Sequence, residues 1–127
     1  MRRTDQRRAA VVALYQADLT DRPLTELLPR ETTEFTRDLA EGVQREQEQL
    51  DALIERYAEG WTLDRIAPVE RSILRVALFE LLHRVDIPAE VAIDEAVETA
   101  KELCGTDAPG FVNGILGSVQ RDQVNAE

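Results

Sequence analysis

Residues 68–84, with the sequence PVERSILRVALFELLHR, establish the fold class of this chain. Pro68 suits the first position of a helix, where its missing N–H group leaves no hydrogen bond unmade. The apolar side chains that follow recur on nearly every face of a helix, which is typical of a helix surrounded by other elements. The stretch therefore predicts a central, deeply buried helix from Pro68 to about Arg84.

The segment before this helix also carries the apolar spacing of helices. We expect one helix over residues 5–19, with Thr4 or Asp5 as its N-cap, and one long helix over residues 33–58. Residues 44–49 are polar throughout, so the middle of the long helix is expected to cross solvent.

After the central helix we expect two more helices, at about residues 91–103 and 107–122, the second capped by Asp107. No segment alternates between apolar and polar residues as a half-buried strand does. The sequence therefore predicts an all-α protein. It is expected to be a single compact helical bundle of about five main helices plus short extra helices, over residues 1–127, with residues 1–4 and 123–127 frayed.

The composition is that of a folded globular domain, since 43% of the 127 residues are hydrophobic and 31% are charged. A single cysteine, Cys104, and a single histidine, His83, exclude a disulfide framework and a Cys/His zinc site. No apolar run reaches the roughly 20 residues of a membrane span, and we expect no signal peptide. These features favour a protein of the reducing cytoplasm without membrane association.

The charge of the chain is unevenly distributed. The formal net charge is −10, yet residues 1–8 hold four arginines and one aspartate. A basic end on an acidic body suits contact with one phosphate-bearing partner, while the remainder repels nonspecific RNA. Cations at a helix start also oppose the helix dipole, and a bound anion would relieve that conflict. The alternative interpretation is a solvated, frayed terminus.

The residues support no catalytic chemistry. The sequence contains no glycine-rich phosphate loop and no His-Glu-x-x-His motif, and it suggests no nucleophile paired with a base. His83 and Cys104 are better explained by partial burial than by catalysis. We therefore expect a protein that is not an enzyme and has no catalytic residue, metal or cofactor.

Two patterns leave alternatives open. Glu80 lies inside the apolar run 78–82, where a carboxylate is costly unless paired, so we expect an internal salt bridge to an arginine rather than a catalytic acid. Gly110, Gly114 and Gly117 follow one another at helical spacing, and each costs a helix roughly 1 kcal/mol relative to alanine. We expect close helix–helix packing there; a ligand or RNA surface is the alternative.

Four blocks of the sequence together resemble the NusB family. They are Arg2-Arg3 with AAVVALYQA at 9–17, WTLDRIAPVERSILRVALFEL at 61–81, DIPAEVAIDEAVETAK at 86–101 and FVNGIL at 111–116. The blocks occur in the family's order and cover essentially the whole chain. The resemblance implies an all-helical transcription antitermination factor. Such a factor pairs with NusE, a small-subunit ribosomal protein, binds the boxA element of nascent RNA, and helps assemble a complex on RNA polymerase in ribosomal RNA operons.

The resemblance also implies where partners bind. It places RNA at Arg2, Arg3, Arg7 and Arg8, and again at Arg65, Asp107 and Phe111, of which Phe111 is expected to stack an unpaired base. It places NusE at Tyr15 and Glu70. The rival hypothesis is a protein–protein module or homodimer whose role does not require RNA. The acidic body and the glycine-lined last helix motivate that rival.

Overall fold

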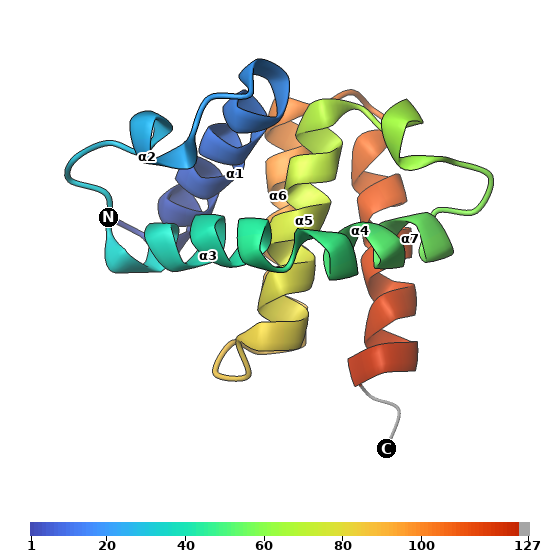
Figure 1. Cartoon of the computed structure of the whole chain (residues 1–127). Helices are drawn as coiled ribbons and strands as arrows, with labels where there is room; N and C mark the ends of the chain where they lie inside the picture. Colours follow the sequence, from blue (N-terminus) through green and yellow to red (C-terminus); the bar gives the residue numbers. More distant parts are fainter. Residues whose placement is uncertain (125–127) are drawn as a thin grey trace.

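The computed structural model describes residues 1–124 and contains only helices, turns and loops in that range (Figure 1). Its elements are α1 (Arg3–Thr20), α2 (Leu24–Leu27), α3 (Glu34–Arg45), α4 (Gln47–Tyr57), the 3₁₀ turn η1 (Leu63–Arg65), α5 (Pro68–His83), α6 (Ala89–Leu103), α7 (Ala108–Val119) and the π-helical turn η2 (Gln120–Val124). The predicted all-α fold is thus confirmed. No helix among these residues is both long and apolar enough to cross a bilayer.

Helix α5 is the element around which the others are arranged. It begins at Pro68 and contacts α1, α3, α4, α6 and α7. Every residue from Ser72 to Leu81 is buried. A helix that is apolar on all sides loses most exposed surface when neighbours cover every face. The sequence-based prediction of a central buried helix is therefore confirmed.

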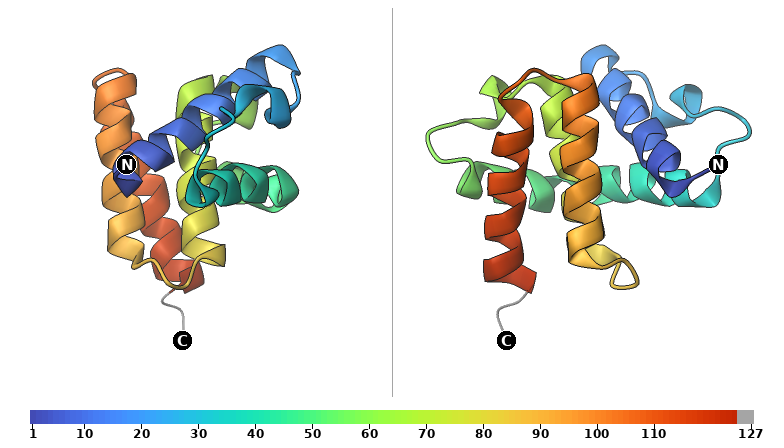
Figure 2. Two further views of the ribbon diagram at one scale, coloured as in Figure 1. Left: turned by 90° about the vertical axis from the view of Figure 1, so that its left-hand side faces the viewer. Right: turned by 180° about the vertical axis from the view of Figure 1, so that it is seen from behind.

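The remaining helices lie on different sides of α5. Figure 1 shows α3 and α4 running across the front of α5, and Figure 2 shows α6 and α7 side by side behind it. The space between them is filled mainly by aliphatic side chains, among them Leu39, Leu50, Ile54, Leu74 and Leu116, all of them under 2% exposed. Burying one such side chain stabilises the fold by about 1.5–3 kcal/mol.

The prediction of one long helix over residues 33–58 is wrong, because the structure has two helices there, α3 and α4. The break lies at Glu46, whose φ of −103° and ψ of 16° leave the helical region. No apolar side chain occurs between Val43 and Leu50 to hold the two halves in line. The break lets α3 pack on α1 and α5 while α4 packs on α5 and α7.

Two predicted helix caps are also wrong. Helix α1 starts at Arg3 rather than Asp5, and the Thr4 hydroxyl instead donates a hydrogen bond of 2.7 Å to Glu95 of α6. Asp107 stands directly before α7, but its backbone is helical rather than extended, and its carboxylate accepts no hydrogen bond from the helix start. Residues 3–4 and 123–124, expected to be frayed, lie in α1 and η2, whereas residues 125–127 fall outside the described part.

The glycines of α7 do not serve the predicted helix packing. Apart from the neighbouring backbone of α7 itself, a Cβ atom added at Gly110 or Gly114 would meet no atom of residues 1–124 within 4 Å, and one at Gly117 would meet only the Arg121 side chain in that range. The closely packed glycine is instead Gly42 in α3, where a Cβ atom would lie 2.2 Å from the Phe79 ring. The glycine-bearing side of α7 is therefore an open surface.

Candidate nucleic-acid interface

Arg7, expected to contact RNA, lies inside the protein and is only 5% exposed. Its Nε donates to both carboxylate oxygens of Glu80, at 2.9 and 3.1 Å, and its Nη2 lies 2.8 Å from Glu80 Oε1. Glu95 of α6 adds a contact at 3.5 Å. This differs from the expected solvent-facing phosphate contact, because the guanidinium is already occupied by carboxylates and covered by protein.

The partner of Arg7 is the buried carboxylate that the sequence singled out. Glu80 is 1% exposed, and its internal salt bridge to an arginine is confirmed. Burial raises the pKa of Glu80 above its usual value of 4.5, and the hydrogen bonds and charge of Arg7 offset part of that rise. The pair ties the start of α1 to the last turn of α5, so we assign Arg7 a structural role.

The other N-terminal arginines lie nearer the surface. Arg2 is exposed and lies 3.4 Å from Asp5. Arg3 is exposed and stacks its guanidinium 4.2 Å from the centroid of Phe35 in α3. Arg8 is part-buried and forms an ion pair with Glu102 of α6. Of these three, Arg3 alone has no carboxylate within ion-pair distance among residues 1–124.

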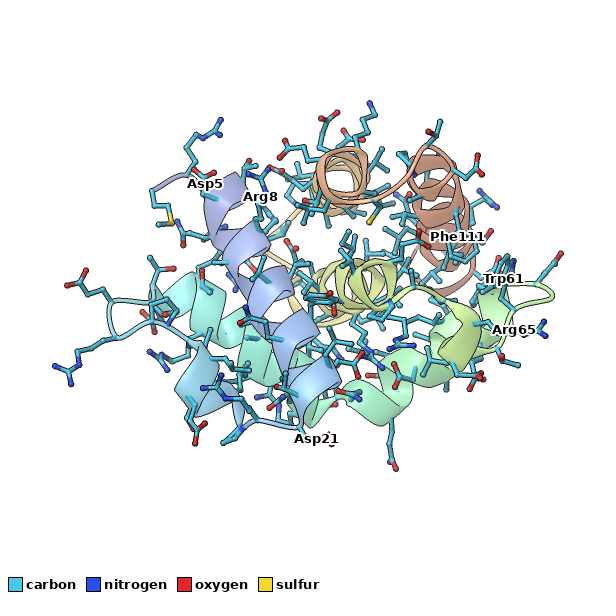
Figure 3. The ribbon with its side chains drawn as sticks, turned by 90° about the horizontal axis from the view of Figure 1, so that it is seen from above. Asp5, Arg8, Asp21, Trp61, Arg65 and Phe111 are labelled. Atoms are coloured by element: carbon cyan, nitrogen blue, oxygen red, sulfur yellow. The ribbon has the colours of Figure 1, made fainter. Side chains whose placement is uncertain are left out.

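A second candidate surface lies where the loop after α4, η1, the start of α5 and the start of α7 meet. It is a cleft of about 280 Å³, called here the aromatic cleft. Its lining joins all three residues predicted for the second RNA contact and one predicted for NusE: Trp61, Arg65, Ile66, Ala67, Glu70, Asp107, Ala108 and Phe111. Figure 3 shows Trp61, Arg65 and Phe111 together on one side of the bundle, opposite Asp5 and Arg8.

Local backbone structure positions the side chains that line the aromatic cleft. Gly60, with a φ of +80°, turns the chain after α4 and leads into Trp61. Arg65 ends η1 with its side chain exposed, and no carboxylate of the described residues lies within ion-pair distance of it. Asp107 is exposed at the start of α7. A guanidinium, a carboxylate and aromatic rings can bind a phosphate, accept from a base N–H and stack a base, respectively.

Trp61 is a functional candidate that the sequence analysis did not select. Its side chain is 49% exposed, and its ring contacts that of Phe111 at a centroid distance of 5.9 Å and an interplanar angle of 65°. The signal in the sequence was a large aromatic residue directly after a turn glycine and outside any helix.

The residues predicted to face NusE lie on adjoining elements. Tyr15 in α1 and Glu70 in α5 are both half-buried, and the ion pair of Asp18 with Arg71, at 2.8 Å, joins their helices nearby. Burial raises the pKa of Glu70, and the described residues provide no cation within ion-pair distance of its carboxylate. A cation supplied by a binding partner would therefore offset the free-energy cost of burying the Glu70 carboxylate.

Comparison with known proteins gives the family. The family model described as NusB family matches residues 4–121. The transcription antitermination protein NusB of Rubrobacter xylanophilus is 43% identical over 122 residues, which cover 91% of this chain and 88% of that protein. This chain belongs to the NusB family.

Solved structures agree with that assignment. The chain is similar to a structure of T. maritima NusB, with a TM-score of 0.89 and 36% identity over 96% of this chain and 92% of that one. It is also similar to a chain in a crystal structure of the antitermination factors NusB and NusE with double-stranded RNA. That likeness has a TM-score of 0.85 and 25% identity, and covers 94% of this chain and 96% of the other.

Proposed function

We propose that this chain is a transcription antitermination factor that binds the boxA element of nascent RNA together with NusE. In ribosomal RNA operons it helps assemble an antitermination complex on RNA polymerase. The observation that carries this proposal is the NusB family match over residues 4–121, supported by the relative that was crystallised with NusE and RNA. The chain acts in the cytoplasm as a binding protein without catalysis.

The RNA follows two surfaces in this proposal. Arg2, Arg3 and Arg8 supply cations at the start of α1, and the aromatic cleft supplies Arg65, Asp107 and Phe111. Arginine forks bind phosphates, and aromatic rings stack bases in single-stranded RNA. Arg7 supports the first surface from inside by holding α1 against α5.

NusE binds beside the aromatic cleft through Tyr15 and Glu70. Glu70 lines the cleft that also holds Asp107 and Phe111, so the protein and RNA surfaces adjoin one another. Adjoining surfaces allow both partners to bind cooperatively, because each can contact the other as well as this chain. Glu70→Lys should therefore weaken NusE binding, while the circular dichroism spectrum and melting temperature stay close to those of the parent.

Fluorescence anisotropy of a labelled boxA RNA tests the proposal. The RNA is titrated with this protein alone and then with NusE added, beside an RNA of scrambled sequence. Binding that favours boxA and tightens with NusE supports the proposal. Equal affinity for the two RNAs, with NusE present at moderate salt, would reject the boxA assignment while leaving the family membership in place.

A second candidate function is self-association through α7. The observation that favours it is the open glycine surface of α7, where Gly114 and Gly117 line a groove between α6 and α7. Light scattering at several protein concentrations tests it. A mass that doubles with concentration, and fails to double in Gly114→Leu, supports a homodimer through this surface; a constant monomer mass rejects it.

A further inference from the structure

We propose that Trp61 is a base-stacking residue, and that its exposed indole face receives one unpaired RNA base in the aromatic cleft. This inference rests on the proposed RNA-binding function. It adds to that function a residue of this chain that was not assigned to RNA from the sequence.

The exposure of Trp61 is the first observation. Trp61 is 49% exposed, whereas each of the other five aromatic residues is buried or half-buried. Tryptophan carries a large apolar surface, so leaving half of it in water forgoes stabilisation that burial would supply. A planar group stacked on the exposed face would remove that surface from water.

The geometry of the two rings is the second observation. Trp61 and Phe111 meet edge to face at 65°, so neither ring covers the other's whole face. The two faces therefore point in different directions and form a corner of the cleft. A base stacked on Trp61 would also contact Phe111, and base–aromatic stacking accepts any base because every base has a π-face.

The placement of charge favours a nucleotide as the occupant. Arg65 is exposed at the cleft and has no carboxylate partner among residues 1–124, so it can pair with a phosphate. Ile66, Ala67 and Ala108 give the cleft an apolar part that suits an uncharged base. Glu70 and Asp107 repel a phosphate from that part, and Asp107 can accept hydrogen bonds from base N–H groups.

Trp61 is the single tryptophan of the chain, which makes its fluorescence a direct probe of the cleft. The protein is titrated with boxA RNA, with and without NusE, whose own emission is recorded separately. The indole emission and its quenching by acrylamide are followed alongside anisotropy of the labelled RNA. We expect RNA to change the emission and to shield Trp61 from acrylamide over the concentration range in which anisotropy rises.

Variants separate stacking from structural support of Phe111. Trp61→Ala should weaken RNA binding by about 5- to 150-fold, the range found for loss of one base–aromatic stack. Trp61→Phe should recover much of the affinity, whereas Trp61→Leu, which still packs on Phe111, should recover little. Val85→Ala is the matched control, since Val85 is an exposed apolar residue in the α5–α6 loop, and it should bind like the parent.

The outcomes distinguish this inference from the proposed function. RNA binding by anisotropy, with unchanged Trp61 emission and parental affinity in Trp61→Ala, would overturn the inference and leave the proposed function intact. A change in emission on adding NusE alone, with no further change on adding RNA, would assign the cleft to the protein partner and would also overturn it. Absence of RNA binding in both readouts would overturn the proposed function and this inference together.

Discussion

The N-terminal arginine segment, residues 1–8, and the aromatic cleft differ in how much of their charge is available to a partner. The segment carries four arginines, yet Arg7 is buried against Glu80, Arg8 is paired with Glu102, and Arg2 lies near Asp5. The cleft carries one arginine, Arg65, which is exposed and unpaired among the described residues. A dense run of cations in a sequence therefore overstates the charge that a folded protein presents.

The acidic body explains the difference. Helices α5 and α6 place Glu80, Glu95 and Glu102 against the first two turns of α1, so the arginines there pair within the chain. Buried pairs of this kind are costly to break, whereas exposed pairs contribute about 0–1 kcal/mol and yield readily to a phosphate. The segment thus combines a structural cation, Arg7, with cations that remain exchangeable.

The largest expected effect comes from removing the structural cation. Arg7→Ala leaves the Glu80 carboxylate buried without its partner, and we expect the free energy of unfolding to fall by about 3–5 kcal/mol. Urea unfolding followed by circular dichroism measures the change. Arg2→Ala is the control and should change stability by less than about 0.5 kcal/mol. A loss below 1 kcal/mol in Arg7→Ala would show that Arg7 is not held as described.

The next effect concerns the aromatic cleft. Phe111→Ala removes an expected stacking surface, and we expect RNA binding to weaken by about 1–3 kcal/mol. Phe111 is half-buried, so the urea midpoint must be measured on the same variant to ensure that folded protein is compared. Parental affinity in a fully folded Phe111→Ala variant would remove the cleft from the RNA interface.

A smaller effect, on the salt dependence of RNA affinity, distinguishes the unpaired arginines Arg3 and Arg65 from the paired Arg8. Arg3→Ala and Arg65→Ala should each reduce the slope of log affinity against log salt concentration by about 0.7, the value for one phosphate contact with single-stranded RNA. Arg8→Ala should change the slope less, because Glu102 already neutralises Arg8 in the free protein. Equal changes of the salt slope in all three variants would mean that RNA displaces Glu102 from Arg8.

The smallest effect is the pH dependence that Glu70 contributes. Its pKa is raised by burial, so the folded protein holds the proton more tightly than the unfolded chain does. The contribution of Glu70 to the free energy of unfolding is then most favourable below its usual pKa of 4.5 and becomes less favourable as pH rises through the folded-state pKa. Glu70→Gln should remove this fall, so the variant should match or slightly exceed the parent near pH 7 in thermal unfolding. A variant that is less stable than the parent at pH 7 but not at pH 4 would contradict the sign.

Sequence reasoning succeeded where a single local pattern determined the structure. The apolar run in residues 68–84 fixed α5 as central, and the carboxylate inside it required an arginine partner. It failed where the outcome depended on how helices cross. Residues 1–8 alone do not distinguish Arg7 from Arg8; Arg7 is directed inward because it shares the face of α1 that carries Val11 and Leu14 and packs on α5.

In the aromatic cleft, too, some residues were predicted from the sequence and others were found only in the structure. The resemblance placed Arg65, Asp107 and Phe111 at an RNA contact, and the structure brings these three residues together. Trp61 joins them because Gly60 turns the chain after α4, a placement that helical periodicity does not encode. Asp107 was expected to cap α7, but its helical backbone leaves the carboxylate in the cleft.

The most direct test of the comparison is the RNA affinity of a variant in which Arg7 and Glu80 are both replaced by methionine. Replacing both members of a buried ion pair by apolar residues of similar size commonly preserves the fold, so RNA binding can be measured without the arginine. We predict that boxA affinity, with NusE present, stays within about twofold of the parent and that the salt slope is unchanged, since Arg7 neutralises no phosphate and so causes no counterion release. A weaker affinity with a slope reduced by about 0.7 in the folded double variant would contradict the account, because Arg7 would then contact RNA directly.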